Sequence, residues 1–148
     1  MFRLMRLALV VILLFHGVGH VIGLAAAWTS VPVGITDAPW IFSADYTIQS
    51  NVGRLFGLGW LLSLLLFLAA LYRLVIREPD WRGFALLAAG LSLIVIVPWW
   101  NAMPVVSLVG AIVVDLVLFV VLLPPWGRQL AEDLADEGAD YTFSRSSR

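Results

Sequence analysis

Four long apolar stretches constrain this chain more than any other feature. They run from Leu7 to Trp28, from Leu55 to Tyr72, from Gly83 to Trp100 and from Met103 to Leu123. Each is close to the ~20 residues that an α-helix needs to cross the hydrocarbon core of a bilayer. Strands of a membrane barrel need only about 10 residues and alternate in polarity, which these stretches do not. The sequence therefore predicts an all-α, integral membrane four-helix bundle.

Composition supports a membrane location and excludes several classes of function. Of the 148 residues, 61% are hydrophobic and only 13% are charged, too few to cover the surface of a soluble domain of this size. The chain has no cysteine, which excludes disulfides, thiol redox chemistry, iron–sulfur ligation and cysteine-based zinc sites. Its net charge of -1 gives no reason to expect nucleic-acid binding. The expected surroundings are the lipid bilayer. Assembly into a homo-oligomer or a larger membrane complex is an open alternative.

Arginine placement predicts the orientation. All basic residues but one lie before the first stretch, between the second and third, or after the fourth: Arg3, Arg6, Arg73, Arg77, Arg82, Arg128, Arg145 and Arg148. The connection 29–53 carries Asp37 and Asp45 and no basic residue, and Arg54, the exception, follows it. Because basic residues accumulate on the cytoplasmic side, both termini are expected to be cytoplasmic, in a multi-pass protein of a bacterial plasma membrane.

The stretches divide the chain into a membrane domain and a tail. We expect a domain 1–126, with helices at about 4–28, 54–76, 83–100 and 103–123, followed by a cytoplasmic acidic tail, 127–148. In the tail, residues 128–137 suit a short amphipathic turn or two before a disordered end, so the tail is expected to be solvated and dispensable for insertion.

The segment 29–53 is predicted to form a cap on the outer side. Asp37, followed by Pro39, is typical of a helix start, so a short interfacial helix is expected there. Such a helix would anchor the chain at the interface, or alternatively cover a cavity that opens outward.

The N-terminus also has features of a signal peptide. Arg3 and Arg6 precede an apolar stretch, and Ala25–Ala27 resembles a cleavage site. The apolar part before that site is longer than is usual for a signal peptide, so we expect an uncleaved first helix that keeps both histidines.

Those two histidines, His16 and His20, are the strongest candidates for a functional site. They lie four residues apart in the first helix, and therefore on one helix face. His16 is about 18 Å below Trp28 along its helix, and Asp115 is about 18 Å below the start of the fourth helix, so the two should lie at equal depth. Ionisable groups at such depth are costly unless they are partnered. We therefore expect a buried site of His16, His20 and Asp115, with Arg54 able to reach His20 or Asp45.

Small residues predict where the helices approach each other. Gly19 and Gly23 form one G-x-x-x-G pattern, and Gly53 and Gly57 form a second. Three serines lie within the predicted helices, and we expect them to bond to their own helix without a special role: Ser63, Ser92 and Ser107.

The polar residues allow several interpretations. In the first, they stabilise the bundle by satisfying one another. Alternatively, His16, His20 and Asp115 bind a metal ion, or the histidines bind haem. A His–Asp pair also suits proton or quinone chemistry, and transport of a proton or small solute is a further alternative. No motif in the sequence indicates enzymatic turnover. The identity of a cofactor stays open among a metal ion, haem and quinone.

The run from Phe15 to His20, F-H-G-V-G-H, together with W-W-N-A-M-P at 99–104, resembles a group of small bacterial four-helix membrane proteins. More loosely, the basic N-terminus and the His-Gly step are similar to the DoxX-like family. The resemblance implies the four-helix architecture, and a role as an accessory membrane subunit linked to redox or thiol metabolism. Because the chain has no cysteine, we expect an accessory or ligand-binding component, with a redox component as the alternative.

The orientation is directly testable. A tag on either terminus should be accessible only from the cytoplasm, whereas single cysteines placed at Asp37 or Asn101 should be labelled by a membrane-impermeant reagent from outside, because eight arginines lie on the opposite side. A C-terminal tag accessible from outside would contradict either the number of helices or their orientation.

Overall fold

The computed structural model describes residues 2–136, and about three quarters of them are helical. The helices are α1 (Phe2–Trp28), α2 (Asn51–Val75), α3 (Trp81–Ile96), η1 (a 3-10 turn, Val97–Trp99), α4 (Val105–Leu122) and α5 (Pro125–Asp136). Four segments, α1, α2, α3 with η1, and α4, are long and apolar enough to cross a membrane. The prediction of an all-α chain with four such helices is confirmed, and α5 is an addition to it.

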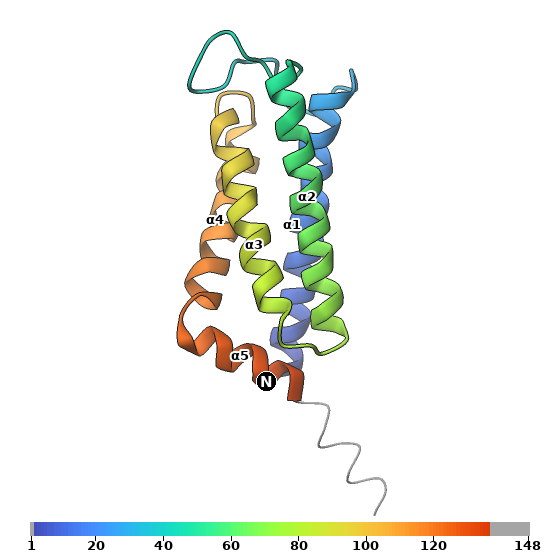
Figure 1. Ribbon diagram of the computed structural model, residues 1–148, viewed down its shortest axis with the longest axis vertical. Helices are drawn as coiled ribbons and strands as arrows, with labels where there is room; N and C mark the ends of the chain where they lie inside the picture. The colour runs from blue at the N-terminus through green and yellow to red at the C-terminus, as the bar shows by residue number, and fades with distance from the viewer. Residues whose placement is uncertain (1, 137–148) are drawn as a thin grey trace, which may run out of the picture.

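The four long helices lie side by side and define two ends of the bundle (Figure 1). The upper end holds the segment 29–50 and the α3–α4 connection, and the lower end holds the start of α1, the α2–α3 connection and α5. Helix α1 packs along α2, α2 along α3, and α3 along α4. Within the described chain, α4 and α1 do not pack closely, so this fourth side of the bundle is open.

Glycines allow α1 and α2 to approach closely. A Cβ atom on Gly23 would overlap the ring of Trp60, and one on Gly57 would lie 2.6 Å from Nε1 of Trp28. Two glycines, one from each predicted pattern, therefore lie at this helix contact. Their lack of a side chain is what accommodates the two indole rings.

The other two predicted packing glycines have different surroundings. The Cβ position of Gly19 has no atom within 4 Å, and Gly53 packs against the backbone of Ile48 in the preceding connection, not against a helix. The close approach falls instead at Gly17, where a Cβ atom would lie 2.8 Å from Cβ of Phe67. Gly19 was mispredicted because the G-x-x-x-G spacing does not identify which face of α1 meets α2.

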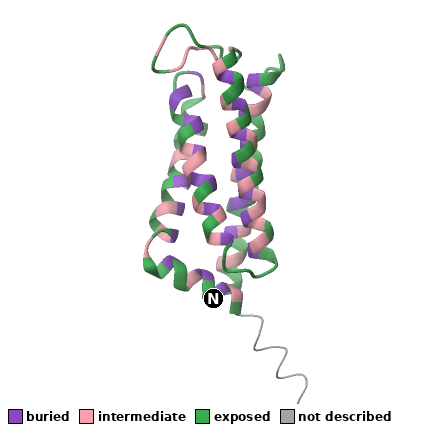
Figure 2. Cartoon of the chain, in the orientation of Figure 1, coloured by how far each residue is buried: buried purple, intermediate pink, exposed green. Residues whose placement is uncertain are grey.

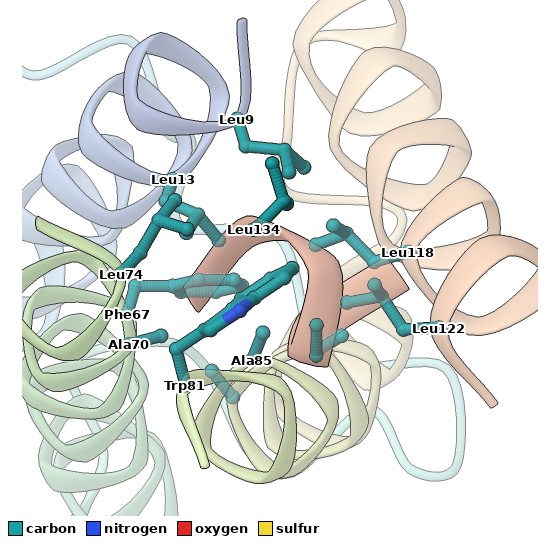
Figure 3. Close-up of a cluster of buried hydrophobic side chains, with 13 residues drawn as sticks. Leu9, Leu13, Phe67, Ala70, Leu74, Trp81, Ala85, Leu118, Leu122 and Leu134 are labelled. Atoms are coloured by element: carbon teal, nitrogen blue, oxygen red, sulfur yellow. The ribbon is translucent and has the colours of Figure 1, made fainter. Parts of the chain in front are cut away.

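Buried residues occur along the length of the helices (Figure 2). They form two apolar clusters, one toward the lower end of the bundle and one toward the upper end. The lower cluster is centred on large residues of all five helices (Figure 3): Leu9, Leu13, Phe67, Leu74, Trp81, Leu118, Leu122 and Leu134. The upper cluster includes Ala26, Ala27, Ile48, Trp60, Val95, Ile96, Trp99 and Leu108. The buried polar side chains have intermediate positions along their helices, between these two sets: His20, Ser63, Ser92 and Asp115.

Helix α5 lies across the lower end of the bundle (Figure 1). Gly127, Ala131 and Leu134 share one face of this helix and are buried, and Leu134 lies among the leucines of the lower cluster (Figure 3). The expectation of a solvated tail is therefore wrong for residues 127–136, because a four- and three-residue spacing of small and apolar side chains lets this helix dock. The remainder of the predicted tail, 137–148, lies outside the described residues.

The upper segment has no helix at Asp37 within the described chain. Instead, Pro39 and Thr47 form an isolated antiparallel bridge, and the backbone N–H of Trp40 donates to the carbonyl of Tyr46. The Trp40 ring contacts Tyr46 and Trp99, which hold it over the end of the bundle. Aromatic packing and cross-strand hydrogen bonds thus replace the helix that the Asp–Pro start signal predicted.

Arginines hold the helix ends at the lower side. Arg6 donates to the carbonyl of Leu74 at 3.0 Å, and Arg82 donates to the carbonyl of Leu122 at 2.6 Å. Helix C-termini leave carbonyl groups without intrahelical partners, and these guanidinium groups satisfy two of them. In the α2–α3 connection, a hydrogen bond from Arg73 lowers the pKa of the exposed Asp80 below its ordinary value.

Docking of α5 is tested by the variant Leu134→Ala. Leu134 is 1% exposed in the lower cluster, so its truncation should destabilise the protein by about 2–4 kcal/mol. The matched control, Leu123→Ala, removes a leucine that is 61% exposed and should change stability by less than about 0.5 kcal/mol. Unfolding in detergent, followed by circular dichroism, measures both. Equal effects of the two variants would contradict docking.

Candidate functional site

Four polar side chains form a continuous hydrogen-bonded path, which we call the polar chain: His16, Asp115, Ser92 and His20. Nε2 of His16 lies 2.8 Å from Oδ1 of Asp115, and Oγ of Ser92 lies 2.6 Å from Oδ2 of the same carboxyl group. Nε2 of His20 lies 3.0 Å from Oγ of Ser92. Nδ1 of His20 lies 2.9 Å from the backbone carbonyl of His16, which brings the path back to α1.

The polar chain joins three helices at one depth. His16 and His20 lie one turn apart on α1, Ser92 is on α3, and Asp115 is on α4. The contact of His16 with Asp115, expected from their equal depth, is confirmed. Sequence reasoning missed Ser92, which bonds to other helices rather than to its own. The same depth rule would have identified it, because Ser92 lies about 10 Å below Trp99 and His20 about 12 Å below Trp28.

Burial makes these contacts energetically significant. Asp115 and Ser92 are fully buried, His20 is 4% exposed, and the His16 side chain is 9% exposed. The ring of Phe67 supports both imidazoles, with centroid distances of 4.9 Å to His16 and 5.5 Å to His20. Gly17 permits this arrangement, because its missing side chain leaves room for Phe67 between the helices. In such surroundings an unpaired polar group would cost several kcal/mol.

Arg54 does not belong to the polar chain. Its guanidinium carbon lies 6.0 Å from the ring centroid of Trp28, at the upper end of the bundle. In residues 2–136, it makes no hydrogen bond or ion pair with His20 or Asp45. Arg54 is exposed in the first turn of α2, so its long side chain lies over an indole ring near solvent instead of descending into the core.

A cavity of about 560 Å³ lies beside the polar chain, between α1 and α4. We call it the α1–α4 cleft. Both histidines line it, and Ser107 is the other hydroxyl or ionisable side chain among its described lining residues. The rest of its wall is glycine or apolar, with contributions from Phe15, Gly19, Trp60, Val106, Gly110 and Ala111. Val33 and Ile35 of the upper segment also line it, which favours the interpretation of that segment as a cover.

The arrangement does not fit the predicted metal site. Among the described residues, no three His, Asp or Glu side chains are grouped as metal ligands. Both ring nitrogens of His20 and both oxygens of Asp115 are used within the polar chain. Haem ligation by His20 would likewise require one of its two contacts to break. His16 is different, because its Nδ1 has no hydrogen-bond partner in the part of the chain that the structure describes.

Comparison with known proteins adds no family to this description. A scan against protein-family models finds no match, and searches of the curated proteins and of the solved structures find none. A relationship to DoxX-like proteins therefore stays a prediction. The function rests on the geometry of the polar chain and the cleft.

A double-mutant cycle tests whether His16 and Asp115 are energetically coupled. His16→Ala removes the hydrogen-bond partner of Oδ1 in the fully buried Asp115 carboxyl group. Adding Asp115→Asn should therefore recover part of the lost stability. We expect a coupling energy in the upper part of the range of about 0.6–1.7 kcal/mol found for polar contacts inside membranes. Thermal unfolding in detergent of the two single variants and the double variant measures it.

The control for this cycle is the exposed pair Arg128 and Glu132 on α5, whose contact is 3.2 Å long. Removing either or both of these side chains by alanine substitution should give a coupling of at most about 0.5 kcal/mol. Additive effects of the His16 and Asp115 substitutions would mean that their contact contributes nothing to stability.

Proposed function

We propose that this protein is a multi-pass membrane protein that binds a small, largely apolar molecule from the lipid phase in the α1–α4 cleft. The observation that carries this proposal is an apolar cleft whose wall includes the two histidines of the polar chain. Ligand sites are typically cavities of about 300–1,000 Å³ with apolar walls and a few polar groups that orient the ligand. The α1–α4 cleft falls within that description.

The open side of the cleft supports entry from lipid. Phe15 on α1 is 71% exposed and Val106 on α4 is 86% exposed, and both line the cleft. Apolar side chains that are exposed on spanning helices face hydrocarbon once the protein is in a bilayer. A molecule dissolved in the membrane can therefore reach the histidines without crossing water.

Binding is favoured over transport by what lies below the polar chain. The lower cluster fills the bundle with large side chains, including Phe67, Trp81 and Leu122, and α5 covers its end. The residues that form this cluster are apolar, so they offer no polar path toward the lower end. Quinones and their reduced quinol forms are small and largely apolar, so a redox role would use the same cleft.

The proposal includes the cellular setting that the arginines predict. With both termini in the cytoplasm of a bacterium, the lower end and α5 face the cytoplasm, and the upper segment faces outward. The absence of any motif for turnover favours an accessory or ligand-binding component over an enzyme. Such a component would deliver or hold its ligand for a partner in the same membrane.

Filling the cleft tests the proposal. A side chain added at Gly110 would meet no atom within 4 Å, so Gly110→Leu should fill the cleft without disturbing the fold. The probe is para-hexylphenol, titrated into protein in nanodiscs and followed by the ¹⁵N signals of the two histidine rings. We expect saturable changes of these signals in the unmodified protein, and their loss in the variant.

The matched control is Gly83→Leu, which also enters open space but lies at the start of α3, away from the cleft residues. It should leave the titration unchanged. Saturation that persists in Gly110→Leu, or that is absent from the unmodified protein, would contradict binding in the α1–α4 cleft.

A further inference from the structure

We infer that the ligand of the α1–α4 cleft carries a hydroxyl group, and that this group donates a hydrogen bond to Nδ1 of His16. The inference rests on the proposed function and specifies the class of ligand. It follows from where protons must lie in the polar chain, and from which of its atoms is left without a partner on a residue that lines the cleft.

The number of protons in the polar chain decides the state of His16. The chain has four contacts, and each needs one hydrogen between its two heavy atoms. With zero net charge, the two imidazoles, the hydroxyl and the carboxyl group together hold four such hydrogens. All four are used within the contacts, so none is left for Nδ1 of His16.

The backbone carbonyl of His16 anchors this count, because it can only accept. Nδ1 of His20 must therefore carry a hydrogen. If His20 is neutral, its Nε2 accepts from Ser92, and Ser92 accepts from a protonated Asp115. If His20 is an imidazolium, it donates to Ser92, and Ser92 donates to an Asp115 carboxylate. In both arrangements the net charge is zero, and His16 donates through Nε2 to Asp115.

The opposite form of His16, with its hydrogen on Nδ1, leaves a defect. Asp115 would then have to donate to Nε2 of His16, and Ser92 would donate to Asp115 and accept from His20. His20 would either face the carbonyl of His16 with a bare nitrogen or carry an uncompensated positive charge. Both outcomes are costly at a site where Asp115 and Ser92 are fully buried.

Nδ1 of His16 is therefore a hydrogen-bond acceptor on a residue that lines an apolar cleft. The side chain is nine-tenths buried, His16 lines the cleft, and this atom has no partner among residues 2–136. An ether, an ester or a ketone without a hydroxyl group offers it no hydrogen. A protonated amine does, but it would bring a charge into apolar surroundings. A hydroxyl group on an apolar body, as in a phenol or a long-chain alcohol, satisfies the acceptor without that cost.

The first test reads the form of His16 directly, without a ligand. The chain has two histidines, so ¹⁵N-histidine labelling gives four ring-nitrogen signals, which Asn substitution at His20 assigns. We expect Nδ1 of His16 to be unprotonated and its Nε2 to be protonated. A hydrogen on Nδ1 of His16 in the unmodified protein would overturn the inference and leave the proposed binding in the cleft intact.

The second test compares three probes of similar size in nanodiscs: para-hexylphenol, para-hexylcyclohexanol and para-hexylanisole. The anisole replaces the O–H group by a methyl ether. We expect the phenol and the alcohol to bind about tenfold more tightly than the ether, the size of effect expected for one hydrogen bond in an apolar site. His16→Phe should retain weak binding of all three probes and remove the difference between them.

Ser92 provides a third test, because it acts through the other residues of the polar chain. It is not among the residues that line the cleft, yet without its hydroxyl the proton count no longer keeps Nδ1 of His16 bare. We therefore expect Ser92→Ala to reduce the preference for the phenol and to broaden or shift the ring-nitrogen signals of His16. The control is Ser63→Ala, which removes another fully buried hydroxyl that has no partner within the described chain.

The outcomes separate the two proposals. If no probe saturates, the proposed function fails, and the inference fails with it. If phenol, alcohol and ether bind equally well, the cleft is a binding site, but the assignment of a hydroxyl donor is wrong. If only the phenol is preferred, the hydroxyl is selected for its acidity, which supports a phenolic ligand; if phenol and alcohol are preferred alike, the ligand class includes simple lipid alcohols.

Discussion

The carboxyl group of Asp115 is the central member of the polar chain, and through it α1, α3 and α4 are joined at the level of the candidate site. It is fully buried and makes one hydrogen bond through each oxygen, with His16 on α1 and with Ser92 on α3. Because α4 and α1 do not otherwise pack closely, the His16 contact is a direct link between them across the open side of the bundle. The same contact orients the imidazole and leaves its Nδ1 without a partner among the described residues. Bundle geometry and the chemistry of the site are thus set by one side chain.

An open side in a four-helix bundle requires the other three sides to be well packed. The small residues that permit close approach are concentrated between α1 and α2, where Gly17, Gly23 and Gly57 face aromatic rings. Those rings also contribute to the candidate site. Phe67 supports both histidines, and Trp60 forms part of the cleft wall, so the contact that closes one side of α1 also shapes the site on its other side.

The sequence predicted the features that depend on hydrophobic length and on depth along a helix. Four apolar helices and the meeting of His16 with Asp115 need only these two quantities, and both are found. The sequence does not predict which way a side chain points around its helix axis. Gly19 was expected at a helix contact but has no neighbouring atom, and Arg54 was expected near His20 but lies over Trp28. The role of Ser92 was missed because a serine in a helix can satisfy itself, and sequence alone does not show when it bonds to another helix. Docking of α5 was missed because its apolar face is small, and its burial depends on leucines that come from the other helices.

Helix α5 makes the two ends of the bundle mechanically unequal. Its Leu134 lies in the same buried cluster as Leu9 and Leu13 of α1 and Leu118 and Leu122 of α4, so α5 closes the lower end of the bundle (Figure 3). At the upper end the cleft is bounded by a loop that contributes Val33 and Ile35. Any separation of α1 from α4 is therefore expected to be widest near the loop and smallest near α5. In such a geometry a small tilt of either helix changes the mouth of the cleft far more than its floor, where the histidines keep their partners.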